Sequence, residues 1–297
     1  MLSTLNSVIT GALAMGNFGL EKAIYFQLIL LGVFVVATLV GYKLISNVPT
    51  LLHTPLMSGM NALSGVTVLG ALSASASLFK LGTAGIVLSA IFGSLAIALA
   101  MVNVVGGFMV TDRMLGMIAK KKAKGQTVIY AASAVAGAGL LAVICCMDVI
   151  AKGAGTSARD WVYLAMAIVL SLGVLLGIAM MGKVAYSKIG NRFSAICMLL
   201  AIILIIVYGN GTSHIAAVWT LYIGLALGTV AGIVLAKKVK MIQMPQMVAL
   251  LNGLGGAASA IVGAFAMLGV GTGFDAFSTT TSALALAVGM ITLIGSL

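Results

Sequence analysis

The chain has 297 residues, of which 62% are apolar and only 7% are Asp, Glu, Lys or Arg, whereas a soluble domain carries roughly 25% of these charged residues. This composition excludes a soluble globular fold, and the abundance of Leu, Ile, Val and Ala also excludes a disordered chain. Long apolar runs without strict alternation favour spanning helices over barrel strands. The predicted fold is therefore an all-α, polytopic bundle of transmembrane helices in a lipid bilayer.

Nine segments are long and apolar enough to cross a membrane, because a transmembrane helix needs about 20 apolar residues. In chain order they are 24–45, 54–78, 82–109, 127–150, 160–182, 193–209, 214–236, 246–270 and 279–297. The connections are short, which suits a compact bundle. The last span stops at Leu297 without a polar or basic anchor, so we expect the chain to be a fragment.

The net charge of +11 is explained by membrane orientation and gives no support to a nucleic-acid partner. With nine spans, 12 of the 16 basic residues fall on one side, which the positive-inside rule identifies as the inside. These are Lys43, Arg113, Lys120, Lys121, Lys122, Lys124, Lys183, Lys188, Arg192, Lys237, Lys238 and Lys240. The N-terminus is then predicted outside and Leu297 inside.

Covalent chemistry has no candidate residues in this sequence. The acidic residues fall at span ends or in loops, and no phosphate-binding loop, zinc spacing or nucleophile–base arrangement is present. Cys145, Cys146 and Cys197 stand in apolar surroundings and are interpreted as small buried hydrophobic residues. We therefore predict neither catalytic residues nor a metal site.

The polar residues that open the second span form the clearest candidate site. The run 53–58, which begins with His53 and contains Pro55, is followed by Asn61 and Ser64. Pro55 fits the first turn of a helix, where its missing N–H costs nothing. Positions 53, 57, 61 and 64 share one helix face, and polar groups inside a membrane are functional candidates. His53 could transfer protons near neutral pH, or it could cap the helix at the membrane interface.

The eighth span carries a second polar group within a glycine-rich run. Asn252 lies about two turns into the apolar segment and must find hydrogen-bond partners or line water. Gly253, Gly255 and Gly256 follow it and allow neighbouring helices to approach closely. Residues 253–258 also match the letters of a dinucleotide-binding fingerprint, but that motif requires a preceding strand. Helix packing is the predicted role of these glycines.

Several runs resemble one family, the proton-translocating nicotinamide nucleotide transhydrogenases. Residues 41–65 and 106–115 are similar to the membrane part of the alpha subunit, and the chain from about residue 160 is similar to the start of the beta subunit. The runs that carry the second similarity are 235–239, 244–249 and 252–258, with a further match at Gly295-Ser296. The resemblance covers most of residues 30–297.

The resemblance suggests a fused arrangement of three segments. We predict an alpha-type transmembrane part at 1–126, a linking segment at 127–159, and a beta-type transmembrane part at 160–297 that lacks its last helices. The alpha part of the family ends inside and the beta part starts outside, so joining them requires one more crossing. The span at 127–150 matches neither subunit well and supplies that crossing.

The resemblance also implies a function and partners. A membrane domain of this family conducts protons, and hydride passes between NAD(H) and NADP(H) at two soluble domains that are absent from this chain. Both cofactors are therefore expected on partner domains, together with the remaining beta-type helices. The family further implies a homodimer in the inner membrane of a bacterium or a mitochondrion.

The resemblance assigns proton handling unevenly. Many members have a histidine where this chain has Asn252, and in members with asparagine there, the natural proton carrier is the histidine that here is His53. Ser296 matches a serine near the channel. Thr281 stands where some members have an acidic residue, so a carboxylate route is not available at that point. Asp112 replaces a common glutamine and is given no function.

The predicted proton path consists of His53, Asn61, Ser64, Asn252 and Ser296. In this hypothesis His53 takes a proton from one side and passes it to water held by the amide and hydroxyl groups. The alternative is a stand-alone transporter or channel for a small solute or ion, with His53 and Asn252 lining its site. A non-conducting scaffold is a third interpretation. Nucleotide-binding domains encoded beside this chain would favour the transhydrogenase.

Overall fold

The computed structural model describes residues 32, 35–36, 38–43, 46, 48–78, 82–118, 137–140, 142, 156–208, 215–269 and 276–297. Within these residues every secondary-structure element is a helix, and six helical segments are long and apolar enough to cross a membrane. The all-α polytopic bundle is thus confirmed. Most of the predicted span 24–45, and nearly all of 127–150, lie outside the described residues.

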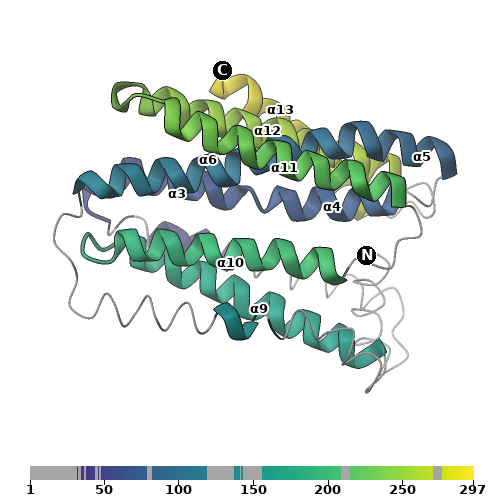
Figure 1. Ribbon diagram of the computed structural model, residues 1–297, viewed down its shortest axis with the longest axis horizontal. Coiled ribbons are helices and arrows are strands. Elements are labelled where there is room, and N and C mark those ends of the chain that lie inside the picture. The colour runs from purple at the N-terminus through teal and green to yellow at the C-terminus, as the bar shows by residue number, and fades with distance from the viewer. Residues whose placement is uncertain are drawn as a thin grey trace.

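The described helices run side by side along the long axis of the molecule (Figure 1). They are α3 (Thr50–Ser64), α4 (Thr67–Leu78), α5 (Gly82–Leu88), α6 (Ser94–Ile118), α9 (Thr156–Met181), α10 (Ser187–Tyr208), α11 (Ile215–Lys238), α12 (Met244–Gly269) and α13 (Ala276–Ser296). A π-helical segment at Ser89–Gly93 joins α5 to α6, and a 3₁₀ turn at Met241–Gln243 precedes α12.

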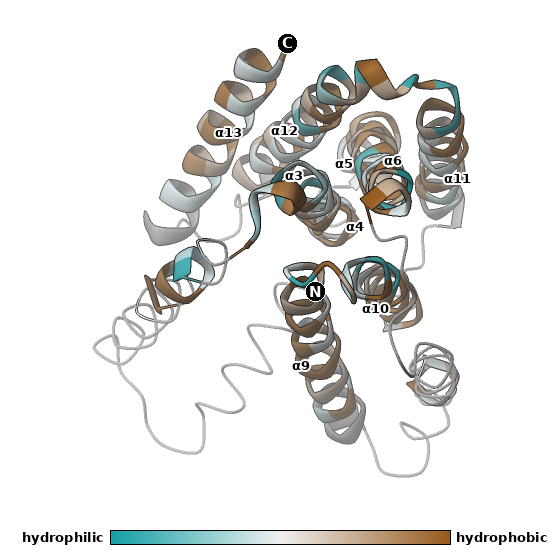
Figure 2. Ribbon diagram, turned by 90° about the vertical axis from the view of Figure 1, so that its left-hand side faces the viewer, coloured by the Kyte–Doolittle hydropathy of each residue, from teal (hydrophilic) through white to brown (hydrophobic). Residues whose placement is uncertain are grey.

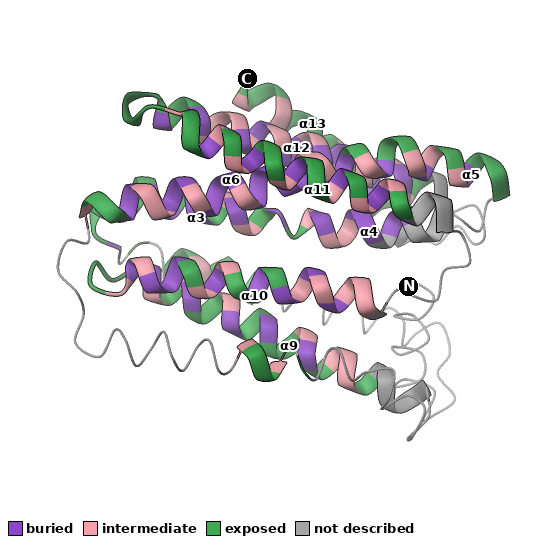
Figure 3. Ribbon diagram, in the orientation of Figure 1, coloured by how far each residue is buried: buried purple, intermediate pink, exposed green. Residues whose placement is uncertain are grey.

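The long helix α6 lies at the centre of the bundle. It packs against α3, α11 and α12, while α9 and α10 form a pair that meets it through α10 (Figures 1 and 2). Buried positions run along α6, whereas α5, α11 and α13 carry long exposed stretches (Figure 3). Among the other buried residues is Cys197, while Cys145 and Cys146 lie outside the described residues.

Small residues allow these helices to pack with their backbones close together. Gly224, Gly228 and Gly232 form one face of α11 against α6, and a Cβ added at Gly228 would lie 2.7 Å from the Cβ of Met101. Real Cβ atoms essentially never approach this closely. The α6–α11 contact therefore depends on the missing side chains, as in other membrane bundles.

The predicted second span is two helices rather than one. It begins at Thr50, because Pro49 occupies the N-cap and its carbonyl accepts the N–H of Leu52 at 2.9 Å. Pro55 consequently lies inside α3, and its predicted place in the first turn was wrong. Between α3 and α4 the helix is interrupted by a turn at Gly65 and Val66.

Two helix ends extend further than predicted. Helix α6 continues to Ile118 and α10 begins at Ser187, so Arg113, Lys188 and Arg192 lie on helices instead of in connecting loops. The basic end of the bundle holds the starts of α3, α10 and α12 and the ends of α6, α9 and α11 (Figure 1). Figure 2 looks onto this end and shows hydrophilic residues there.

Candidate functional site

His53 lies at the basic end of the bundle, near the start of α3. Its side chain is in an exposed residue, and the ring Nε2 is 3.0 Å from the backbone carbonyl oxygen of Val48. Because a carbonyl only accepts, Nε2 carries the proton in this hydrogen bond. The ring thus holds the segment that precedes α3, which fits an interfacial position.

A second group of polar residues lies deeper, where α3, α6 and α12 meet. Asn61 donates from Nδ2 to the carbonyl of Val248 on α12 at 2.9 Å. Asn103 on α6 is fully buried, and its Nδ2 lies 3.0 Å from the carbonyl oxygen of Asn61 and 3.1 Å from Ser64 Oγ. The Ser64 hydroxyl in turn donates to the Asn61 carbonyl at 2.6 Å. One backbone oxygen of α3 therefore accepts two side-chain donors.

The same group surrounds the interruption between α3 and α4. Thr67 Oγ1 donates to the carbonyl of Ser64 at 3.0 Å and lies 3.2 Å from the hydroxyl of Ser259 on α12. Backbone groups freed by a break inside a membrane must be satisfied by side chains or water. Transporters commonly place their ion sites at such broken helices, so the arrangement is suited to holding water and protons.

Asn252 and Ser296 form a third group on a different side of α12. Asn252 Nδ2 donates to Ser296 Oγ at 2.8 Å, which joins α12 to α13. Gly256 lies on the α13 side, where an added Cβ would be 2.8 Å from a backbone nitrogen of α13. Gly253 also faces Ser296, whereas Gly255 faces Asn103 on α6.

The five residues of the predicted path therefore lie in three places. His53 is at the start of α3, Asn61 and Ser64 are at the α3–α4 break, and Asn252 bonds Ser296 between α12 and α13. Within the described part of the chain no direct hydrogen bond links one group to another.

Sequence reasoning missed Asn103, Thr67 and Ser259. Asn103 carries the same signal as Asn252, an amide inside a long apolar run, and applying one criterion to every span would have found it. The two hydroxyls have no comparable signal, because a Ser or Thr in a membrane helix can bond to its own backbone.

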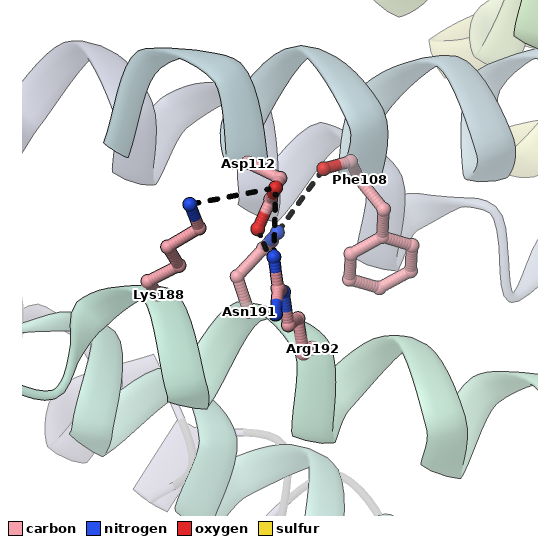
Figure 4. A network of polar contacts seen from close by, with 5 residues as sticks. All are labelled: Phe108, Asp112, Lys188, Asn191 and Arg192. Carbon is pink, nitrogen blue, oxygen red and sulfur yellow. Dashed lines mark hydrogen bonds and ion pairs between the residues drawn. The ribbon is translucent and has the colours of Figure 1, made fainter. Parts of the chain in front are cut away.

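A charged cluster joins α6 to α10 near the basic end (Figure 4). Arg192 donates from Nε to Asp112 Oδ1 at 3.0 Å and from its terminal nitrogen to Oδ2 at 3.3 Å. Lys188 Nζ is 4.0 Å from the same carboxylate, and buried Asn191 donates to the carbonyl of Phe108 at 3.1 Å. Asp112, to which the sequence assigned no function, thus holds the α9–α10 pair against α6.

The next residue, Arg113, points to the other neighbour of α6. Its guanidinium donates to the carbonyls of Ala236 and Val239, the second at 3.0 Å. These carbonyls lie at the C-terminal end of α11, where backbone oxygens have no helical partner. A cation is favoured there, so adjacent residues of opposite charge hold two different helices.

Two family models match this chain in succession. Residues 30–120 match the 4TM region of pyridine nucleotide transhydrogenase, and residues 163–297 match the NAD(P) transhydrogenase beta subunit.

Curated relatives match the first of these regions. The chain is 44% identical over 93 residues to the second of the proteins that make up NAD(P) transhydrogenase subunit alpha in Rhodospirillum rubrum, covering 31% of this chain and 63% of the relative. It is also 44% identical over 90 residues to the protein of the same name from Rickettsia prowazekii, covering 30% and 63%. The match to the alpha subunit of Cereibacter sphaeroides is 44% over 88 residues, covering 30% and 16%. The chain thus spans less than two thirds of each of these relatives.

Proposed function

We propose that this chain, which belongs to the NAD(P) transhydrogenase family, forms much of a membrane domain that couples proton movement to hydride transfer between NAD(H) and NADP(H). The observation that carries the proposal is the succession of the two family matches, 30–120 and then 163–297. The chain is an integral protein of the inner membrane, and its apolar helices are suited to that place. The hydride-transfer site and both nucleotides belong to partner domains.

The proposed proton path begins at His53, which exchanges protons with water at the basic end of the bundle. Asn61 lies eight residues further along α3, about 12 Å at 1.5 Å per residue. Direct proton transfer requires hydrogen-bond contact, so intervening water or a movement of α3 must bridge this distance. Asn61 and Ser64 would hold water at the α3–α4 break, and Asn252 with Ser296 would hold water between α12 and α13.

The partners in this proposal are two soluble nucleotide-binding domains, the remaining beta-type helices, a second copy of the chain and the lipid bilayer. Helix α13 supports the need for such neighbours, because Leu284, Val288 and Ile291 are exposed on it. Apolar side chains on a membrane helix are covered by lipid or by other helices. Alternating access of His53 to the two sides would be driven by nucleotide binding to the partner domains.

The test is hydride transfer from NADPH to an NAD analogue in vesicles that contain this chain and its co-expressed nucleotide-binding partners, with and without an imposed pH gradient. The expected result is activity that responds to the gradient, and loss of that response in His53→Ala. Met57→Ala is the matched control, because Met57 is also exposed and lies one turn further along α3. A gradient response that survives in His53→Ala would remove His53 from the path. The absence of any activity with these partners would contradict the proposed function.

A further inference from the structure

Asn103 has one polar group in use and one without a partner. The side chain is fully buried, and its Nδ2 meets both the Asn61 carbonyl and the Ser64 hydroxyl. Its Oδ1 is buried and has no hydrogen-bond partner among the described residues. Burying an unpaired amide oxygen is destabilising, so packing alone does not explain an asparagine at this position.

The hydrogen bonds fix the orientation of this amide. The Asn61 carbonyl can only accept, and the Ser64 hydroxyl already uses its proton on that carbonyl. Turning the amide over would place Oδ1 against two acceptors, so Nδ2 must face α3. On the opposite side lies Gly255 of α12, where an added Cβ would be 2.6 Å from Nδ2. The glycine leaves the space that the amide occupies.

The same hydrogen bonds replace part of the helix ladder. In a continuous helix the carbonyl of Asn61 would accept the N–H of Gly65. Here that N–H donates to Ala62 at 3.1 Å, and the side chains of Asn103 and Ser64 satisfy Asn61 instead. The Asn61 carbonyl therefore has two alternative sets of donors, and only the set supplied by α6 accompanies the break.

We propose that Asn103 is a positioning residue of the proton path, which holds the α3–α4 break open through the Asn61 carbonyl and offers Oδ1 as an acceptor to the water that passes the break. The proposal rests on the proposed function for its consequence but not for its geometry. Losing the bond from Asn103 lets the Gly65 N–H return to Asn61 and closes the break.

The carbonyl of Asn61 can be observed by itself, because Asn61-Ala62 is the one Asn-Ala pair in the sequence. Labelling asparagine with ¹³C at the carbonyl and alanine with ¹⁵N gives a single cross-peak in solid-state NMR of the chain in lipid bilayers. We expect this peak to shift in Asn103→Leu, which keeps a side chain of similar size and removes both polar groups.

A matched control separates this effect from general destabilisation. Asn191 on α10 is also buried, also donates to a backbone carbonyl of α6, and also has an unpartnered Oδ1. Asn191→Leu should leave the Asn61 peak in place. Gly255→Ala perturbs Asn103 from the other side and should shift the peak, whereas at Gly253 an added Cβ would make only a 3.4 Å contact, so Gly253→Ala should not.

The functional consequence is measured as gradient-driven proton flux in vesicles that hold the whole complex. We expect flux in Asn103→Leu to fall about tenfold, the factor that about 1.4 kcal/mol produces, and flux in Asn191→Leu to stay near wild type. If Asn103→Leu does not fold, Gly255→Ala decides by the same two measurements. An unmoved Asn61 peak, an equal shift in Asn191→Leu, or unchanged flux with a shifted peak would each overturn the proposal. If the wild-type complex carried no flux, the proposed function would fail, and the peak would still decide whether Asn103 holds the break.

Discussion

Replacing Asp112 with Asn should weaken the contact between α6 and α10 by about 1 kcal/mol. Arg192 meets both carboxylate oxygens, at 3.0 and 3.3 Å, and this two-point geometry favours the upper part of the range measured for surface pairs. The side chains of Asp112 and Arg192 are 32% and 48% exposed, so water screens the attraction and the much larger values of a dry interior do not apply. Lys188, at 4.0 Å and 31% exposed, adds little.

The measurement is a double-mutant cycle in mixed micelles, with Asp112→Asn, Arg192→Gln and the double variant unfolded by a neutral denaturant. Raising the salt concentration from 0.1 to 1 M shortens the Debye length from about 10 Å to about 3 Å. The coupling free energy should therefore fall by about half or more. Asp112 paired with Lys237 is the control cycle, because Lys237 lies on α11, away from the α10 contact, and no coupling is expected.

A coupling free energy below about 0.2 kcal/mol would refute this reasoning, since that is the lower limit for exposed pairs with good geometry. A coupling that does not change with salt would refute it in a different way. The contact would then be held by hydrogen bonding or packing rather than by charge.

Further predictions concern helix contacts and the path. Gly228→Ala should destabilise the protein by about 1–3 kcal/mol in thermal unfolding, because backbone and side-chain atoms of α6 leave no room for a methyl group. Gly70→Ala, where an added Cβ would meet its nearest neighbour at 3.7 Å, should be neutral or stabilising by up to about 1 kcal/mol. Arg113→Gln should cost about 1.5–3 kcal/mol and speed amide exchange at the C-terminal end of α11, because charged hydrogen bonds to its last carbonyls are lost. Ser296→Ala should remove the partner of Asn252 and cost about 1 kcal/mol of unfolding free energy, and an unchanged denaturation midpoint would show that this bond contributes nothing.

The sequence predicts helices well where length and hydropathy decide, and poorly where another helix decides. The spans that became α9, α11 and α12 begin and end within a few residues of the prediction. The break at Gly65 was not predicted, because its cause is a side chain on α6 that bonds to the carbonyl of Asn61. A pattern read along one segment contains no information about that donor.

The candidate site divides in the same way. The helical spacing 53, 61 and 64 placed Asn61 and Ser64 together at the break, while the pairing of Asn252 with Ser296 has no basis in spacing and needed two helices in place. The resemblance to a family supplied both residues but not the side of α12 on which they lie. That side depends on how α12 is rotated between α6 and α13, which packing determines.

The contacts between α6 and α10 connect two regions that match different subunit descriptions, 30–120 and 163–297. On separate chains, a charge pair worth about 1 kcal/mol would add little to assembly against the entropy lost on association. On one chain, each region meets the other at a local concentration set by their covalent connection, in the millimolar range for short linkers. Continuity of the chain therefore allows a weak, partly exposed contact to persist, and it fixes the two regions at equal stoichiometry from the moment of synthesis.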